Sequence, residues 1–382
     1  MIKKKIFWVA HEGNRSGANN ALLDYAEVLI HEDYDIVIII PSIGNLVAEC
    51  HQRGLKTKLF YYAGVTKVGK GGFFNTLKKI FRNLVTLVQF IFYLRKTKPN
   101  IVISNSIVTP AIFGLASKLF RIPHIWFIQE FGDKDHNLIF DFGYPLTVRI
   151  INLVSDKVIA VSDAVKNHLS RFIKPDKIYV ILNRVAVKQK ALFISEKKHI
   201  PFRVLHLSQI NSGKNQLEGV MAIDLLLKKG LDIELEMTGA ILDYNYYGLI
   251  QNYISENRSE EKIYFSGFTE EPYKKIAESN LCILCSKCEA CSLTIFEVLR
   301  IGTPIIVSNT GGNPEIIKDT QIGLVYELSN VEDLANKIEL LYYNPSYAEE
   351  LSLKGQKYSE MHYNIEKSIM QLKEIFNSVL YN

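Results

Sequence analysis

Short, almost wholly apolar segments alternate along the chain with longer segments in which apolar residues recur every three to four positions. The run YDIVIIIPS at residues 34–42 is typical of a parallel strand buried on both faces. The segment 18–30 instead places Leu22, Ala26 and Leu29 at helical spacing. Because strand and helix patterns follow each other throughout, the sequence predicts an α/β protein built from βαβ units.

The pattern is most informative between residues 281 and 317. The apolar run LCILCS predicts a buried strand, and after a polar loop a helix is expected to begin near Ser292, a residue type that favours helix N-caps. Gly302 fits the end of this helix, and Pro304 begins the next apolar run. The stretch therefore predicts strand, loop, helix and strand in sequence.

Two carboxylates flank the start of this predicted helix, Glu289 in the loop and Glu297 in the helix. Free N–H groups and the helix dipole favour a phosphate there, while carboxylates accept hydrogen bonds from sugar hydroxyls. A nucleotide sugar would satisfy both requirements. From spacing alone, two solvated glutamates around an ordinary helix are the simpler explanation of the pattern.

The stretch resembles the motif of retaining glycosyltransferases of family 4, which have the GT-B fold and include enzymes of bacterial surface-polysaccharide synthesis. Their E-x7-E pattern is matched by Glu289 and Glu297, their G-x-P-(V/I)-(V/I) turn by 302–306, and their GG-x-x-E loop by 311–315. The resemblance implies two Rossmann-like domains facing a central cleft. It is strong for the second half of the chain and only general for the first.

The resemblance also implies roles for individual residues. Glu289 contacts the donor sugar, Glu297 contacts the ribose, and Lys214 neutralises the diphosphate. Glu130 stands where the family often has a histidine, and it is the candidate for an acceptor contact. The implied catalytic residues are Lys214, Glu289 and Glu130. The implied donor-binding residues are Gly17, Gln209, Lys214, Asn215, Gly239, Phe268, Glu289, Cys291, Ser292, Leu293 and Glu297.

One position departs from the family pattern. Gln209 replaces the usual diphosphate-binding arginine, and an amide supplies only a neutral hydrogen bond. Either activity is weak or another cation compensates, with Arg15 and Arg184 as candidates. No D-x-D motif of the kind used by metal-dependent transferases is identified, so we expect no metal and no other cofactor.

The expected domains are 1–185 for the acceptor, 202–360 for the nucleotide sugar, and a charged linker at 186–201. A helix at about 361–382 is expected to pack back on the first domain.

Composition narrows the choice of partners. A net charge of +5 over 382 residues does not indicate nucleic-acid binding. No run reaches the roughly 20 apolar residues that span a bilayer, so we expect a cytoplasmic protein, with the inner face of the plasma membrane as a further option. The helical segment 73–98 is basic and aromatic, which suits either a packed Rossmann helix or a membrane surface.

Four of the five cysteines are spaced as CxxCxxCxxC, close to a ligand run for iron–sulfur or zinc. Against a metal site, Cys282 and Cys285 fall in an apolar strand with odd spacing, which directs them to opposite faces. A metal protein therefore remains an alternative to the enzyme.

The family resemblance thus implies that the protein is a hexosyltransferase. It would move a hexose from a nucleotide-diphosphate sugar, by default a UDP-sugar, to a hydroxyl of a saccharide or lipid-linked saccharide. A sugar-nucleotide epimerase on the same fold is the second alternative.

Overall fold

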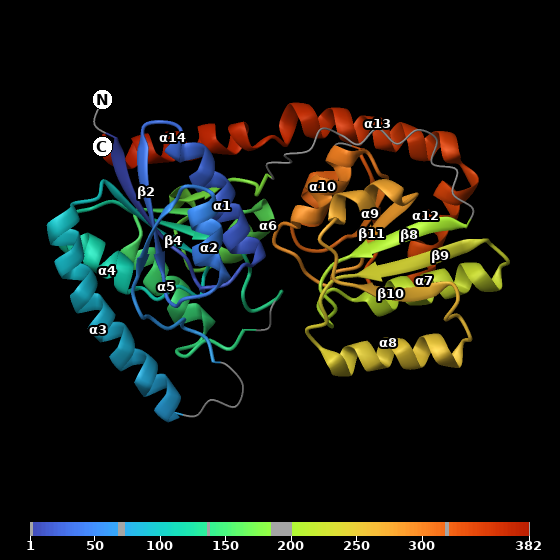
Figure 1. Ribbon diagram of the computed structural model, residues 1–382, viewed down its shortest axis with the longest axis horizontal. Coiled ribbons are helices and arrows are strands. Elements are labelled where there is room, and N and C mark those ends of the chain that lie inside the picture. Colours follow the sequence, from blue (N-terminus) through green and yellow to red (C-terminus); the bar gives the residue numbers. More distant parts are fainter. Residues whose placement is uncertain (1–2, 68–72, 136–137, 185–200, 318–320, 382) are drawn as a thin grey trace. The chain divides into compact units, whose positions relative to one another are not determined.

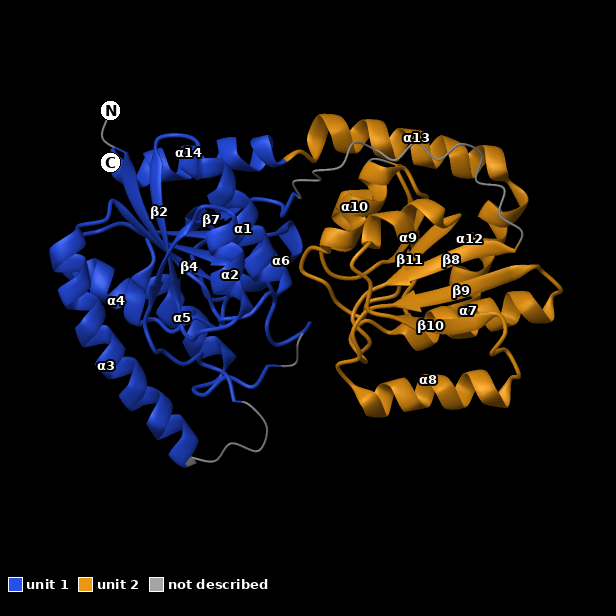
Figure 2. Ribbon diagram, viewed as in Figure 1, with its two compact units in different colours: residues 1–184, 365–382 blue, residues 185–364 orange. Residues whose placement is uncertain are grey.

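The computed structural model describes residues 3–67, 73–135, 138–184, 201–317 and 321–381. The chain forms two compact units: Met1–Arg184 with Ile365–Asn382, and Val185–Asn364 (Figure 2). The expected linker, 186–201, lies almost entirely outside the described residues.

Unit 1 contains one parallel sheet of seven strands in the order β3-β2-β1-β4-β5-β6-β7 (Figure 1). Its strands are β1 (Lys4–Val9), β2 (Tyr34–Ile40), β3 (Lys56–Leu59), β4 (Ile101–Asn105), β5 (His124–Ile128), β6 (Lys157–Ala160) and β7 (Ile178–Val180). Its helices are α1 (Gly17–Ile30), α2 (Asn45–Gln52), α3 (Phe73–Thr97), α4 (Ile112–Leu119), α5 (Tyr144–Val154), α6 (Asp163–Leu169) and α14 (Ile365–Leu380), with a 3-10 turn at Pro175–Lys177.

Unit 2 contains a second parallel sheet, with six strands in the order β10-β9-β8-β11-β12-β13. Its strands are β8 (Phe202–Leu207), β9 (Ile233–Thr238), β10 (Ile263–Gly267), β11 (Leu281–Leu284), β12 (Ile305–Ser308) and β13 (Leu324–Tyr326). Its helices are α7 (Gln216–Lys228), α8 (Tyr244–Glu256), α9 (Pro272–Glu278), α10 (Leu293–Ile301), α11 (Asn313–Ile317), α12 (Val331–Tyr343) and α13 (Pro345–His362).

Each sheet is covered on both faces, which explains the nearly continuous apolar strand sequences. In unit 1, Phe7 of β1 packs with Phe90 of α3, which in turn meets Phe113 of α4 edge-on at 4.9 Å between ring centroids. Trp8, the next residue of β1, points to the other face and stacks on Tyr25 of α1. The prediction of two Rossmann-like α/β domains is therefore confirmed.

The C-terminal region consists of two helices, of which the second lies in the range 361–382 where a helix packing on the first domain was expected. The first, α13, packs against α10 of unit 2. The second, α14, belongs to unit 1, where Phe376 meets Tyr34 edge-on and Lys373 pairs with Glu32 at 2.7 Å. Within the described ranges, none of the helices combines the length and the apolar character that crossing a membrane requires.

Candidate functional site

The strand order of unit 2 reverses between β8 and β11. The chain runs outward from β8 through β9 to β10, and then from β11 through β12 to β13 on the other side. In parallel sheets, ligands bind at the carboxyl ends of the strands where the order reverses. The two segments at this position are 208–215, after β8, and 285–292, after β11.

Lys214 and Glu289 meet at this point, since the Lys214 ammonium pairs with Glu289 Oε1. The Lys214 backbone is held by Asn211, whose Oδ1 accepts the N–H groups of Gly213 at 3.0 Å and Lys214 at 3.1 Å. Asn215 follows in the left-handed conformation, with φ 55°, and α7 begins after it. The predicted cation and the predicted sugar-binding carboxylate are thus brought together.

Glu289 is held from several sides. Its Oε1 also accepts a hydrogen bond from Ser286 Oγ at 3.0 Å, and its backbone oxygen accepts the N–H of Gly312 at 2.8 Å. Gly311 has φ 65°, and a Cβ there would lie 2.0 Å from the Glu289 backbone oxygen. The GG-x-x-E loop therefore needs glycine because it supports the Glu289 loop.

The start of α10 lies next to Glu289 in the sequence. Ser292 is its N-cap and Gly302 its C-cap, as predicted, but the Ser292 side chain makes no capping hydrogen bond. The Ser292 N–H is directed to Asn313 Oδ1 at 3.3 Å. Cys291 and Leu293, on either side of Ser292, and Glu297, further along the helix, are partly buried.

Three other predicted residues of unit 2 follow strand ends. Gln209 is exposed after β8, and its backbone oxygen accepts a hydrogen bond from Gln216 at 2.8 Å. Gly239 follows β9, where a Cβ would lie 2.0 Å from the Ser208 backbone oxygen, so tight packing between strand ends accounts for this glycine. Phe268 follows β10 and its side chain is 73% exposed.

A buried histidine lies beneath this group. Burial, with the Lys214 charge as the second cause, lowers the pKa of His206 to about 4. The imidazole is therefore neutral at pH 7 and adds no positive charge to the site. Lys214 and the N–H groups of α10 are two sources of positive potential that the described geometry offers here.

The predicted residues of unit 1 have different surroundings. Gly17 is the first residue of α1, and a Cβ there would meet no atom within 4 Å. Glu130, the candidate for an acceptor contact, is buried, and its Oε1 accepts hydrogen bonds from Ser106 Oγ and from the Ile107 N–H at 2.8 Å.

Of the two compensating cations that were considered, Arg184 is buried and donates to Ser368 and Gln371 of α14 at 2.8 and 3.0 Å. These contacts give Arg184 a structural role in attaching α14.

A chain of side-chain amides at the strand ends of unit 1 was not predicted. Asn183 donates to Gln129, Gln129 donates to Asn105 at 3.1 Å, and Asn105 donates to the Ala18 backbone oxygen at 3.0 Å. All three amides directly follow or end apolar strand runs. That position is the sequence signal that would have identified them.

The cysteine run does not converge on one point. Leu281, Ile283 and Cys285 alternate onto the face of the sheet that forms the unit 2 core, so Cys282 points to the opposite face. Burial raises the pKa of the Cys285 thiol to about 12, which disfavours a metal-binding thiolate. Within the described ranges no three or more His, Cys, Asp or Glu side chains are grouped to hold a metal ion.

The expectation that the sequence lacks a D-x-D motif is wrong. Asp133 and Asp135 flank a lysine in the loop after β5, and the same spacing occurs at 33–35. Asp135 accepts two backbone N–H groups of its own loop at 2.8 and 2.9 Å, and Asp133 lies 2.8 Å from His168 Nε2. Both carboxylates therefore have partners that fix this loop.

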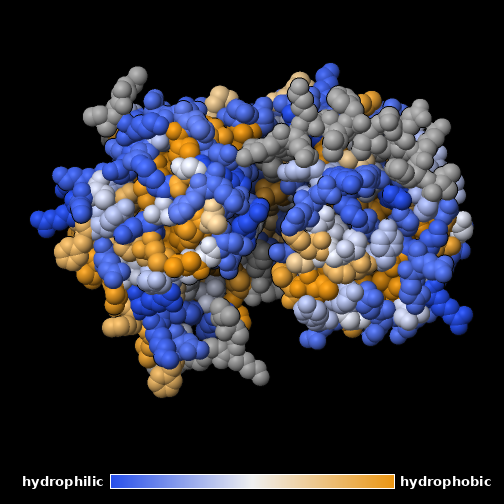
Figure 3. Space-filling view, viewed as in Figure 1, coloured by the Kyte–Doolittle hydropathy of each residue, from blue (hydrophilic) through white to orange (hydrophobic). Residues whose placement is uncertain are grey.

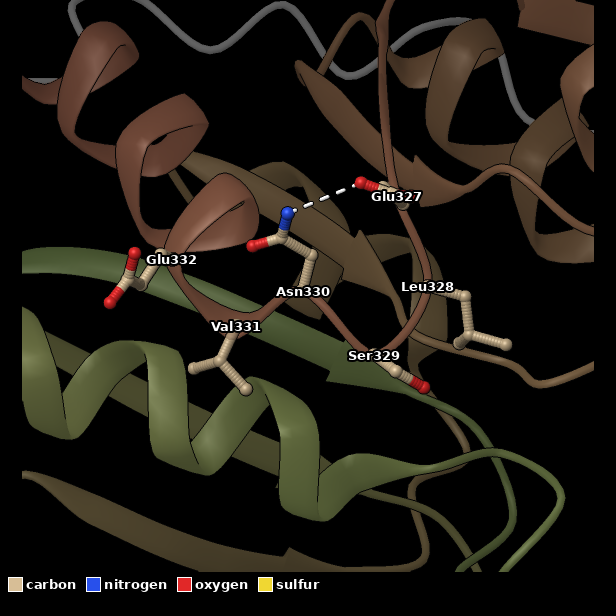
Figure 4. Close-up of a pocket in the computed structure, with 6 residues that line it drawn as sticks. All are labelled: Glu327, Leu328, Ser329, Asn330, Val331 and Glu332. Carbon is tan, nitrogen blue, oxygen red and sulfur yellow. Dashed lines mark hydrogen bonds between the residues drawn. The ribbon is translucent and has the colours of Figure 1, made fainter.

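A shallow depression in unit 2 contains none of the predicted site residues (Figure 4). It lies between β13 and α12, where Asn330 donates to Glu327 at 3.2 Å and caps the helix by accepting the Asp333 N–H at 3.0 Å. Since Glu327 and Glu332 line it, the depression does not suit a diphosphate. Its residues are Glu327, Leu328, Ser329, Asn330, Val331 and Glu332.

Comparison with known proteins identifies glycosyltransferases. Residues 15–189 match the family model Glycosyltransferase Family 4, and residues 187–358 match Glycosyl transferases group 1. An uncharacterized glycosyltransferase of Haemophilus influenzae is 24% identical over 376 residues, which are 98% of this chain and 100% of that protein.

Two further similarities are informative. The Escherichia coli UDP-Gal:alpha-D-GlcNAc-diphosphoundecaprenol alpha-1,3-galactosyltransferase is 24% identical over 348 residues, 85% of this chain and 84% of that protein. The crystal structure of Anabaena HepE in complex with UDP has a TM-score of 0.83 at 16% identity, over 98% of this chain and 100% of that one. Because the two family models together cover residues 15–358 and the fold is shared, the predicted enzyme class is confirmed, and the chain belongs to the glycosyltransferases of GT-B fold.

Proposed function

We propose that this glycosyltransferase moves a hexose from a nucleoside-diphosphate sugar to a hydroxyl of a lipid-linked saccharide in bacterial surface-polysaccharide synthesis, with retention at the anomeric carbon. The observation that carries the proposal is the meeting of Lys214 and Glu289 at the strand reversal of unit 2. Parallel sheets bind ligands at such a strand reversal. Glu289 also lies just before the first residue of α10 in the sequence.

The similar proteins support the choice of substrates. The name of the Escherichia coli relative specifies a UDP-sugar donor and a diphosphoundecaprenol-linked acceptor. HepE has been crystallised with UDP and with UDP-glucose. UDP is therefore the first nucleotide to test.

Donor binding exchanges partners at the Lys214–Glu289 pair. The diphosphate forms an ion pair with the Lys214 ammonium, and the sugar hydroxyls donate hydrogen bonds to the Glu289 carboxylate. Neither charged side chain is then left without a partner. Glu297 accepts hydrogen bonds from the ribose. The exposed ring of Phe268 is available to the base.

Catalysis then depends on positive potential at the leaving group. Negative charge develops on the departing nucleoside diphosphate, and Lys214 and the α10 N–H groups stabilise it because they are in place beforehand. The leaving phosphate oxygen accepts the proton of the acceptor hydroxyl on the same face, so no protein base is needed. Gln209 contributes a neutral hydrogen bond where the family has an arginine. The proposed reaction uses no metal.

Donor binding is tested by thermal unfolding with UDP, GDP, dTDP or ADP, each in EDTA and in magnesium. A nucleotide at about a hundred times its Kd adds roughly 2.7 kcal/mol and raises Tm by several degrees. We expect this shift with UDP, in EDTA as well, and its loss in Glu297→Ala. Equal shifts with all four nucleotides, or none, would contradict the proposal.

Turnover is tested with Lys214→Ala and the control Lys357→Ala, an exposed lysine of α13. We expect the first to lower kcat by roughly a hundredfold or more, as loss of a charge-stabilising donor does, with the Tm little changed. Wild-type turnover in Lys214→Ala would refute the assignment.

The reaction itself is identified from its products. The anomeric configuration of the product, read by NMR, checks retention. An altered donor sugar formed without any acceptor would instead identify an epimerase.

A further inference from the structure

Helix α3 has two faces of opposite character. Thr86, Phe90 and Leu94 are buried against the rest of unit 1. On the opposite face, large apolar side chains recur every three to four residues, and their exposed fractions run from 42% at Val85 to 77% at Phe74. They are Phe74, Leu77, Phe81, Leu84, Val85, Val88 and Phe92.

The loop before α5 adds to this exposed stripe. Asp141 pairs with Lys79 of α3 at 2.8 Å and accepts a hydrogen bond from Thr76 at 3.3 Å. Its neighbours Ile139 and Phe142 are 63% and 53% exposed. We call the seven α3 side chains, Ile139 and Phe142 together the α3 surface. Figure 3 shows apolar atoms next to hydrophilic ones along the outer edge of α3.

The sequence around the α3 surface is strongly cationic. The 80 residues from Cys50 to Gln129 contain 13 Lys and Arg and no Asp or Glu, whereas the rest of the chain has 32 Lys and Arg against 40 Asp and Glu. Lys78, Arg82 and Lys96 are exposed on α3 itself. The positive charge is therefore concentrated in the part of the chain that carries the exposed stripe.

We propose that the α3 surface binds the surface of an anionic lipid bilayer. A helix with one wide apolar face and flanking lysines lies in the membrane interface, with its apolar side chains among the acyl chains and its cations at anionic headgroups. A stripe at this spacing could also pair with a second copy of the chain. Charge favours lipid, because two copies would bring like charges together.

This proposal goes beyond sugar transfer and does not depend on it, since vesicle binding can be measured without donor or acceptor. The full chain is sedimented with phosphatidylcholine vesicles that contain either no phosphatidylglycerol or about 30% of it. We expect binding only to the anionic vesicles. Binding should weaken steeply above physiological salt, because exposed charges are then screened.

Two variants separate the apolar and the electrostatic contributions. Phe74→Ser/Phe81→Ser/Phe92→Ser removes the aromatic rings, and Lys78→Glu/Arg82→Glu/Lys96→Glu reverses three charges. We expect each to lower vesicle partitioning about tenfold or more.

Matched controls change residues of the same kind elsewhere. Leu242→Ser/Tyr244→Ser/Leu249→Ser alters exposed apolar residues of unit 2, and Arg171→Glu/Lys174→Glu/Lys357→Glu reverses the same number of exposed charges. Both controls should bind anionic vesicles like the wild type, and circular dichroism verifies that all four variants fold.

Several outcomes would overturn the proposal. One is that the protein binds neutral and anionic vesicles equally, and another is that it binds no vesicles at all. A variant and its matched control that lose vesicle partitioning to the same extent would have the same consequence. A wild-type dimer that becomes a monomer in the Phe→Ser variant, without vesicle binding, would show that the stripe joins two copies of the chain.

Discussion

Two glycines of the predicted site differ in what their positions require. Gly311 has φ 65°, and a side chain there would collide with the Glu289 backbone. Gly17 has open space around its Cβ position, so only a bound ligand would require a glycine there. The first position serves the structure of the site, whereas the predicted role of the second is in binding.

Alanine at each position separates these roles. Gly311→Ala combines left-handed strain with a backbone collision, so we expect a loss of about 2–4 kcal/mol in the free energy of unfolding, together with a loss of activity. Gly17→Ala should leave stability unchanged within about 1 kcal/mol and raise KM for the donor. Urea unfolding and donor kinetics measure both effects. Unchanged KM in Gly17→Ala would remove Gly17 from the donor site.

At the scale of elements, Glu218 joins the start of α7 to the loop before α12. Its carboxylate accepts the Ser329 N–H at 2.8 Å and a hydrogen bond from Asn215, the residue after Lys214. Burial is the main cause that raises the pKa of Glu218. The carboxylate thereby fixes the turn that carries Lys214.

Removal of this carboxylate should affect both stability and catalysis. Glu218→Ala removes the charged acceptor of the Ser329 N–H and the Asn215 amide, which costs about 1–3 kcal/mol, and it should lower kcat because Lys214 loses its support. Glu218→Gln keeps an acceptor for the Ser329 N–H and should restore most of the stability. Glu256→Ala, on the exposed side of α8, is the control. Equal effects of Ala at 218 and 256 would contradict this role.

At the scale of the whole molecule, each unit contains a histidine that complete burial keeps neutral at pH 7. Burial lowers the pKa of His124 in unit 1 to about 3, and that of His206 in unit 2 to about 4. Unfolded, both titrate near 6.5. Each histidine therefore contributes stability that is complete above about pH 6.5 and is lost as the pH falls toward the folded pKa, because the unfolded chain binds the proton more readily.

We accordingly expect stability to fall on mild acidification. Each histidine should contribute a loss of about 1.4 kcal/mol per pH unit below 6.5, or about 2 kcal/mol at pH 5. Urea unfolding at pH 7, 6 and 5 measures this slope. His124→Gln should flatten it, whereas His31→Gln, on the exposed C-cap of α1, should not. An unchanged slope in His124→Gln would exclude His124 as a source.

The predicted fold follows from local features that sequence displays directly. Buried parallel strands require apolar runs, and the helix from Leu293 to Ile301 begins and ends at the predicted Ser292 and Gly302. The site residues between 281 and 317 were predictable because they lie in one short stretch with fixed spacing. The surroundings of Glu130 and Arg184 were not predicted. Their hydrogen-bond partners, Ser106 and Ser368, are far away in the sequence.

The sequence by itself determined the alternation of strands and helices, the order of the motifs and the charge of residues 50–129, since each depends on neighbouring positions or on composition. Only the tertiary structure decided which distant side chains meet. It pairs Lys214 with Glu289, buries Glu130 and leaves one face of α3 exposed. The reason is physical: hydrophobic periodicity specifies which face of an element is apolar, but the packing of the other elements determines whether that face is covered.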